Sequence, residues 1–215
     1  MEDNTMTNEQ LKNEIISRFK PIISSWDASD IYVISFFVYD FRDNPRKPTV
    51  TLGYNTEEWF REYGKSASDE KEARWNYAFW IQNEEFVFGE PDETGTHEIV
   101  REWIKSNNLV DLSDEETIEE EIDENDQEAI MQRWLKDVDI LDELAEKVTK
   151  KFVDVLVDVS KELHETGFIQ DKFGKTIPII IHELEYYDEI ARQNERTNPS
   201  DAVSDFVTWI DEMYG

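Results

Sequence analysis

The sequence brings a histidine and several carboxylates together at one place. His182 is followed within seven positions by Glu183, Glu185, Asp188 and Glu189. Carboxylate oxygens are the ligands that Mg²⁺ and Ca²⁺ prefer, so these residues could hold a divalent cation. A zinc-protease helix would need a second histidine four positions after the first, and position 186 holds tyrosine instead. Such clusters also arise by chance in an acidic chain, so a metal site formed by His182, Glu183 and Glu185 is a hypothesis only.

No other pattern in the chain points to a catalytic or cofactor site. The remaining histidines, His97 and His164, lie at the ends of expected helices and are interpreted as structural. The chain has no cysteine, which excludes disulfides, thiolate metal sites and a cysteine nucleophile. Glycine-rich phosphate loops and the nucleophile-elbow motif are absent from the sequence. We therefore predict no catalytic residue and no cofactor, although carboxylate pairs that meet only in space stay open.

The charge of the chain is its most unusual property. It has 51 Asp and Glu residues against 22 Lys and Arg, a formal net charge of −29. Residues 111–128 contain eleven acidic residues and no basic one, and the stretch lacks the glycine and ligand spacing of a calcium loop. We interpret it as an acidic, low-complexity insertion or linker within a single domain of residues 1–215.

Such a charge favours a basic protein partner and disfavours nucleic acid and membrane surfaces. The simpler interpretation is that the charge only keeps the protein in solution. If a basic partner binds, the candidate contact residues are the acidic side chains of the insertion, namely Asp114, Glu115, Glu116, Glu119, Glu120, Glu121, Asp123 and Glu124.

The elements around these residues predict an α+β fold with a small, mainly antiparallel sheet packed by several helices. The runs 31–41 and 49–55 read as strands joined in an antiparallel hairpin, and 176–182 reads as a further strand with Pro178 at an edge or bulge. Residues 86–88 are either a short strand or a plug in the core. The aromatic block 74–80 suits a core better than a base-stacking surface.

Helical periodicity is clear in two places. An N-terminal helix begins after Thr7, and Pro21 is expected to kink or end it. Apolar residues also recur at helical spacing over 128–163, with a break expected near Asp137–Asp139, because one unbroken helix would be too long for a compact domain. Asn55 is expected to cap a helix that contains Trp59.

The N-terminal residues resemble no signal peptide, and no apolar run approaches the roughly 20 residues of a membrane span. With the absence of cysteine, these features lead us to expect a cytoplasmic protein.

Several short motifs, spread over most of the chain, resemble a family of uncharacterised acidic bacterial proteins, a domain of unknown function. Some members of that family resemble immunity proteins, which protect bacteria from their own secreted toxins. The resemblance implies a fold more than an activity, and the stretch 111–128 departs from the family pattern. The matching residues are Tyr32, Asn55, Thr56, Glu57, Arg74, Trp75, Trp80, Leu163, Gly167, Phe168, Asn198 and Pro199.

The leading functional hypothesis is a non-catalytic, immunity-like binding protein that neutralises a basic partner such as a toxin. Affinity should then fall with salt, and removal of residues 111–128 should weaken binding. The alternative is a carboxylate-based, divalent-metal-dependent enzyme near His182, Glu183 and Glu185. A third possibility is a structural or regulatory module with an uncharged partner. The sequence identifies neither the partner nor the oligomeric state.

Overall fold

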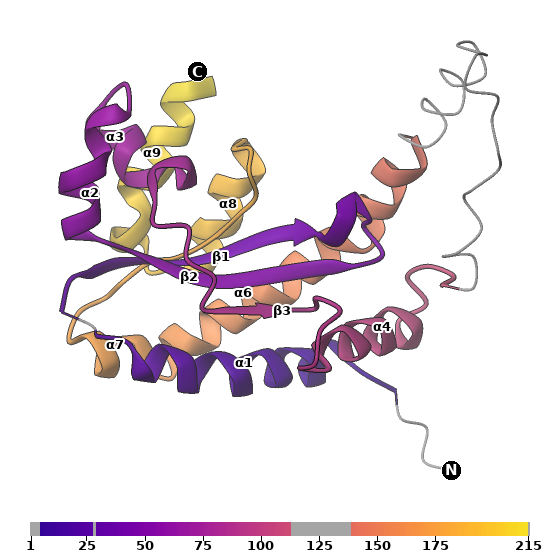
Figure 1. Cartoon of the computed structure of the whole chain (residues 1–215). Helices are drawn as coiled ribbons and strands as arrows, with labels where there is room; N and C mark the ends of the chain where they lie inside the picture. The colour runs from indigo at the N-terminus through magenta and orange to yellow at the C-terminus, as the bar shows by residue number, and fades with distance from the viewer. Residues whose placement is uncertain (1–4, 28, 113–138, 215) are drawn as a thin grey trace, which may run out of the picture.

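The computed structural model describes residues 5–27, 29–112 and 139–214, and these form an α+β fold in which helices cover both faces of one mixed sheet (Figure 1). The expected fold class is therefore confirmed. Most of the acidic stretch 111–128, including all eight candidate contact residues, lies outside the described residues.

The sheet has four strands in the order β3-β2-β1-β4. They are β1 (Ile31–Asp40), β2 (Pro48–Thr56), β3 (Phe86–Phe88) and β4 (Ile179–His182), so the segment 86–88 is a strand. β2 pairs antiparallel with both β1 and β3, whereas β4 pairs parallel with β1, with Ile34 opposite Ile179 and Phe37 opposite His182. Because β1 and β4 are parallel, their carboxyl ends lie at the same edge of the sheet.

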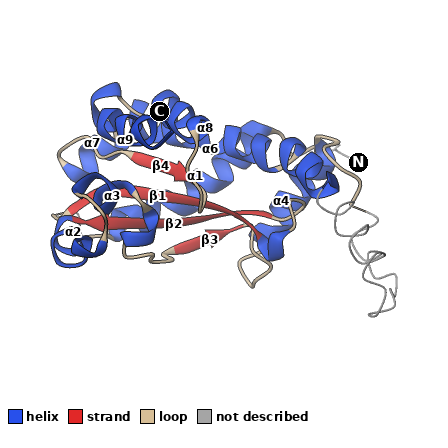
Figure 2. Ribbon diagram, turned by 90° about the horizontal axis from the view of Figure 1, so that it is seen from above, coloured by secondary structure: helices blue, strands red, loops and turns tan. Residues whose placement is uncertain are grey.

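Alternation along the strands divides the core into two layers, because successive side chains point to opposite faces of the sheet. Ile34, Phe36, Ile179 and Ile181 belong to one apolar cluster, whereas Val33 and Ile180 belong to the other. The first layer is covered by α1 (Asn8–Ser25), α4 (Thr96–Ser106), α6 (Thr149–Glu165) and α7 (Phe168–Phe173). The second is covered by α2 (Glu57–Tyr63), α3 (Glu70–Trp75), α8 (Asp188–Thr197) and α9 (Ser200–Tyr214) (Figure 2).

The outer edge of β4 is closed by asparagine side chains from α8 and its C-cap. The Asn194 amide accepts from the Ile181 N–H and donates to the Ile181 C=O, each at 2.8 Å. Asn198 does the same for Ile179. A carboxamide offers the same donor and acceptor as a peptide group. Four helical residues also rise by about 6 Å, close to the spacing of alternate strand residues. Asn194 of α8 and Asn198 at its C-cap thus take the place of a fifth strand.

Two local expectations need correction. Pro21 does not end the N-terminal helix, because it lies inside α1, which continues to Ser25. The carbonyl that a proline deprives of its donor belongs to Ser17, and both residues are exposed, so water can satisfy it. Asn55 is not a helix cap. Thr56 caps α2 by accepting from the Trp59 N–H at 3.1 Å, while the buried Asn55 donates to the Tyr32 hydroxyl.

The expected break near Asp137–Asp139 lies mostly outside the described residues. Within them, residues 139–147 are helical, and a turn at Val148 separates them from α6. Helical hydrogen bonds still flank the turn: the Val148 N–H donates to the Leu144 carbonyl, and the Phe152 N–H donates to the Val148 carbonyl. Thr149 therefore begins α6 beside the carboxyl end of β1.

Candidate pocket at the carboxyl ends of β1 and β4

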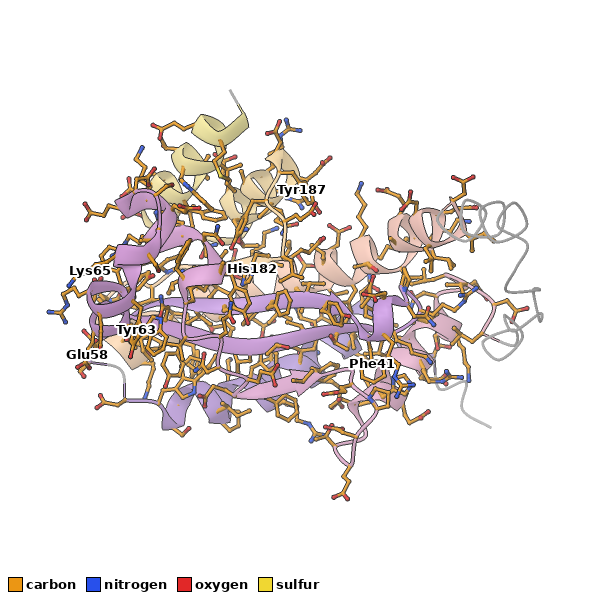
Figure 3. All side chains as sticks on the ribbon, turned by 45° about the horizontal axis from the view of Figure 1, so that its top comes forward. Phe41, Glu58, Tyr63, Lys65, His182 and Tyr187 are labelled. Carbon is orange, nitrogen blue, oxygen red and sulfur yellow. The ribbon has the colours of Figure 1, made fainter. Side chains whose placement is uncertain are left out.

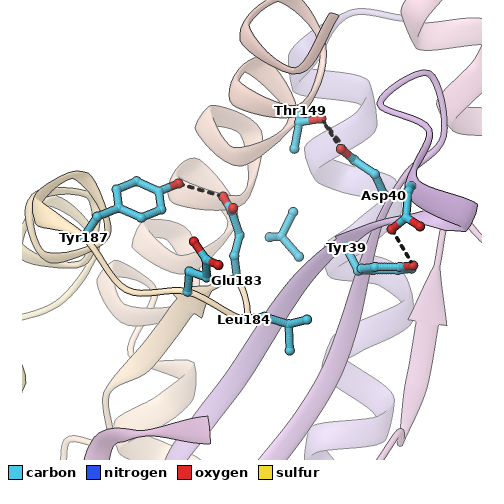
Figure 4. Close-up of a pocket in the computed structure, with 9 residues that line it drawn as sticks. Tyr39, Asp40, Thr149, Glu183, Leu184 and Tyr187 are labelled. Carbon is cyan, nitrogen blue, oxygen red and sulfur yellow. Dashed lines mark hydrogen bonds between the residues drawn. The ribbon is translucent and has the colours of Figure 1, made fainter. Parts of the chain in front are cut away.

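Two adjoining pockets open at the sheet edge where β1 and β4 end. Their volumes are about 320 and 530 Å³, a size range typical of ligand sites. Four side chains line both pockets: Asp40, Thr149, Glu183 and Tyr187 (Figure 4). The crevice outside the carboxyl ends of parallel strands is where such sheets commonly bind ligands.

Each of the four shared side chains is placed by the end of a regular element. Asp40 is the last residue of β1, and Glu183 directly follows β4. Thr149 is the first residue of α6, and Tyr187 is the N-cap of α8. Residues that are 147 positions apart in the sequence therefore meet because two parallel strands stop at the same level.

Asp40 is held in an environment that opposes its ionised form. The pKa of its carboxyl is raised to about 6: burial is the main cause, the Thr149 hydroxyl acts in the other direction, and the nearby Glu183 and Asp43 carboxylates contribute to the rise. Thr149 Oγ1 lies 2.9 Å from both carboxylate oxygens and donates to the carboxylate. Asp40 makes no ion pair with any described cation.

Glu183 repeats this arrangement on the other side of the pocket. Burial raises the pKa of its carboxyl, and repulsion from Glu185 adds to the effect. The Tyr187 hydroxyl donates to Glu183 Oε1 at 3.1 Å and favours the ionised form. Burial also raises the pKa of Tyr187, so its hydroxyl keeps its proton and remains a donor. The pocket thus combines two partly buried carboxyl groups with one hydroxyl donor each.

Three large apolar or aromatic side chains are exposed around this pair. Leu184 is 68% exposed, and Tyr39 and Tyr187 are 39% and 37% exposed. All three line the smaller pocket. An apolar side chain as exposed as Leu184, next to two exposed aromatic rings, is typical of a surface that a partner covers.

His182 does not belong to the pocket, although it precedes Glu183. It is the last residue of β4 and is in register with Phe37 of β1, and Tyr187 lies further from the sheet (Figure 3). Its ring is fully buried among Phe37, Tyr77, Trp80 and Tyr186. Burial lowers the pKa of the imidazole to about 4, so the ring is neutral at neutral pH.

Both ring nitrogens of His182 are already used. Nδ1 lies 3.0 Å from the Glu183 carbonyl oxygen and must donate to it. Nε2 therefore accepts from Ser35 Oγ at 2.8 Å. A serine that donates to a histidine also occurs in hydrolases, but here Ser35 and His182 are 2% and 0% exposed. The pair links β1 to β4 in the interior and is out of reach of a substrate.

The metal-site hypothesis gains no support from this geometry. His182 has no free nitrogen, and only Glu183 and Glu185 of the three residues line a pocket. Among the described residues, no group of three histidine or acidic side chains could hold a metal ion. None of the described helices combines the length and apolar character that a membrane crossing requires.

Sequence reasoning missed most of the pocket. It singled out Glu183 and Glu185, but for a different role, and it did not identify Asp40, Thr149, Tyr187 or the exposed Leu184. The available signal was an acidic residue next to the end of each of two expected strands, Asp40 in the run 31–41 and Glu183 after the run 176–182. That signal becomes informative only once the strands are known to be parallel neighbours.

Comparison with known proteins adds no relative. No protein-family model, no curated protein and no solved structure matches the chain. The resemblance to an uncharacterised bacterial family therefore stays a prediction, and the function has to be argued from the pocket itself.

Proposed function

We propose that the protein is a non-catalytic binding protein that engages a basic protein partner through the pocket at the ends of β1 and β4. The observation that carries this proposal is the pairing of two partly buried carboxyl groups, Asp40 and Glu183, with the exposed side chain of Leu184. Burying carboxyl groups without a cation costs stability, and such a cost is common at functional sites.

An immunity-like role fits this surface. A nuclease toxin binds phosphates through basic residues, and carboxylates on an inhibitor can occupy the same positions. The net charge of −29 would speed the approach of such a partner. The acidic residues of 111–128 add to this long-range attraction.

A pull-down from a lysate of the source cell at low salt tests the proposal. The bait carries Asp40→Asn with Glu183→Gln, and the matched control carries Glu195→Gln with Asp211→Asn. The control residues are exposed and line neither pocket, and the loss of charge is the same. We expect a basic protein to elute from the wild type and the control and to be lost from the pocket variant. Equal recovery with all three baits would refute the pocket as the interface.

The metal-dependent enzyme remains a separate hypothesis that no observation favours. Its test is the melting temperature in Mg²⁺, Mn²⁺ or Ca²⁺, compared between the wild type and His182→Ala with Glu185→Ala. The hypothesis requires a shift in the wild type that the variant lacks.

A further inference from the structure

The carboxyl pair of the pocket is surrounded by more acidic than basic groups. The acidic side chains that line the two pockets beside Asp40 and Glu183 are Asp43, Glu185, Glu146, Asp154 and Glu189. They come from every element around the pair: the 3-10 turn after β1, the loop after β4, the segment before α6, α6 itself and α8. Among the described residues, the remaining titratable groups of the lining are the hydroxyls of Tyr39 and Tyr187 and three cations.

Each of these cations is already engaged with another carboxylate. Lys150 pairs with Glu146 at 3.1 Å, Arg192 with Asp188 at 3.5 Å and Arg196 with Asp154 at 3.7 Å. No described cation therefore neutralises Asp40 or Glu183. The pocket has room and charge for a cation from outside the chain.

The apolar rim indicates which cation fits. The exposed Leu184 can cover an aliphatic stem, and the rings of Tyr39 and Tyr187 offer faces for a planar cation. A guanidinium group is planar, stacks on aromatic rings, binds carboxylates in a bidentate manner and is less strongly hydrated than an ammonium group. Arginine therefore matches this combination better than lysine does.

We propose that one arginine side chain of the partner enters the pocket and binds the carboxylates of Asp40 and Glu183, and that at acidic pH it displaces a proton that the pair otherwise retains. The inference rests on the proposed function, because it specifies the group that the basic partner inserts. The O–H bond of the protonated carboxyl breaks, the proton passes to solvent, and the carboxylate left behind binds the guanidinium. Because burial raises the pKa of Asp40 to about 6, the exchange takes place in a measurable pH range.

The probe is the capped peptide acetyl-Gly-Gly-Arg-Gly-Gly-amide, and its control carries citrulline, which has the same shape without the charge. Affinity is measured by NMR titration of the full chain at pH 7.5 and pH 5.0, with the amide spectrum confirming the fold at both values. At pH 5.0 about one Asp40 in ten is ionised if its pKa is 6, so we expect roughly tenfold weaker binding than at pH 7.5. The citrulline peptide should not bind.

Two variants identify the groups. Asp40→Asn should weaken binding at pH 7.5 and reduce the pH dependence well below tenfold, because only the Glu183 carboxyl of the pair is then left to titrate. Leu184→Ala should weaken binding at both pH values and keep the tenfold ratio, because only the contact with the aliphatic stem is lost.

The possible failures are distinct. Absence of binding at both pH values, with the fold intact, would overturn the pocket as an arginine site, whereas the proposed function is overturned separately by equal recovery of the partner with all three baits of the pull-down. Equal affinity at pH 5.0 and pH 7.5 would overturn the proton exchange alone and leave the interface standing. Equal binding of the citrulline peptide would overturn the choice of a guanidinium group.

Discussion

At the scale of single residues, Asp40 is the clearest sign that this surface has a role beyond folding. Its carboxyl is mostly buried, forms no ion pair with any cation of the described residues and has a pKa of about 6. Relative to a carboxyl in the unfolded chain, whose pKa is near 4, the ionised form at neutral pH destabilises the folded state by at most about 3 kcal/mol. A position that served only stability would carry a neutral side chain.

The variant Asp40→Asn should therefore be more stable than the wild type at pH 7.5. The amide can still accept from Thr149, and the cost of a buried charge disappears. We expect a gain of about 1–3 kcal/mol, or a few degrees in melting temperature. The raised pKa stabilises the wild type increasingly as pH falls from 6 towards 4, so the advantage of the variant should shrink to nothing near pH 4. Denaturant unfolding across this range measures both effects, and a variant less stable at pH 7.5 would contradict the assigned pKa.

His182 should show the opposite pH dependence. The unfolded imidazole takes up a proton near pH 6.5, whereas the buried ring does so only near pH 4. Stability is therefore lost as pH falls from 6.5 to 4, by roughly 3 kcal/mol when the shift is complete. Ring ¹⁵N spectra should show the neutral form, with the proton on Nδ1, down to about pH 4.5. A ring that is charged at pH 6 would contradict the buried link to Ser35.

The residue scale is also where sequence reasoning reached its limit. The cluster that follows His182 marked the correct strand end, because acidic residues do gather there. The cluster led us to place His182 among carboxylates, whereas its ring is buried among aromatic side chains. The sequence alone cannot show that Tyr77, Trp80 and Phe37 enclose the ring. Asp40 lies more than 140 positions earlier and has no pattern of its own, so only the pairing of β1 with β4 could reveal it.

At the scale of elements, the positions of the strands were easier to predict than the roles of residues at helix caps and within helices. Apolar runs with β-branched and aromatic residues located β1, β2 and β4 correctly within a few residues. The errors lie where one residue could serve two roles. Asn55 looks like a helix cap but serves as a buried partner for Tyr32, and Pro21 sits in a helix because its exposed position makes the missing hydrogen bond inexpensive.

The hydrogen bonds that Asn194 and Asn198 make to the outer edge of β4 can be tested by mutation. Replacing Asn194 with Leu leaves the buried Ile181 N–H without a partner, while Gln193 still donates to the Ile181 carbonyl. We expect a loss of about 2–4 kcal/mol, from one orphaned donor and the other bonds of the amide. Hydrogen exchange should also become faster at Ile181 and in the adjoining part of β4.

The exposed Asn13→Leu in α1 is the matched control, because the same substitution there breaks only one long side-chain contact. Its effect should stay within about 0.5 kcal/mol. Unchanged stability and exchange in Asn194→Leu would mean that the edge of β4 does not depend on this amide. A variant that forms dimers or aggregates would instead show that the opened edge recruits another strand.

At the scale of the whole molecule, the expected strands and helices predicted the fold class but not the two-layered core. The absence of cysteine and the abundance of aromatic residues indicated a domain held together by apolar packing. The parallel placement of β4 beside β1 could not be read from the sequence, because its partner strand lies about 140 residues away. The parallel pairing brings Asp40 and Glu183 together and so forms the pocket. The chain therefore carries two kinds of negative charge: the local pair at Asp40 and Glu183, and the general excess of carboxylates.

These two kinds of charge should affect the kinetics of binding differently. Replacing the eight acidic residues from Asp114 to Glu124 by their amides removes long-range attraction and keeps the chain length. Against a basic partner recovered by pull-down, this variant should associate about three- to tenfold more slowly at low salt and dissociate at the wild-type rate. Asp40→Asn with Glu183→Gln should instead raise the dissociation rate at least tenfold, because contacts in the bound complex are lost. Stopped-flow or surface-binding kinetics at two salt concentrations distinguish the cases. If the amide variant changed only dissociation, the acidic stretch itself would have to contact the partner, and the pocket would not be the whole interface.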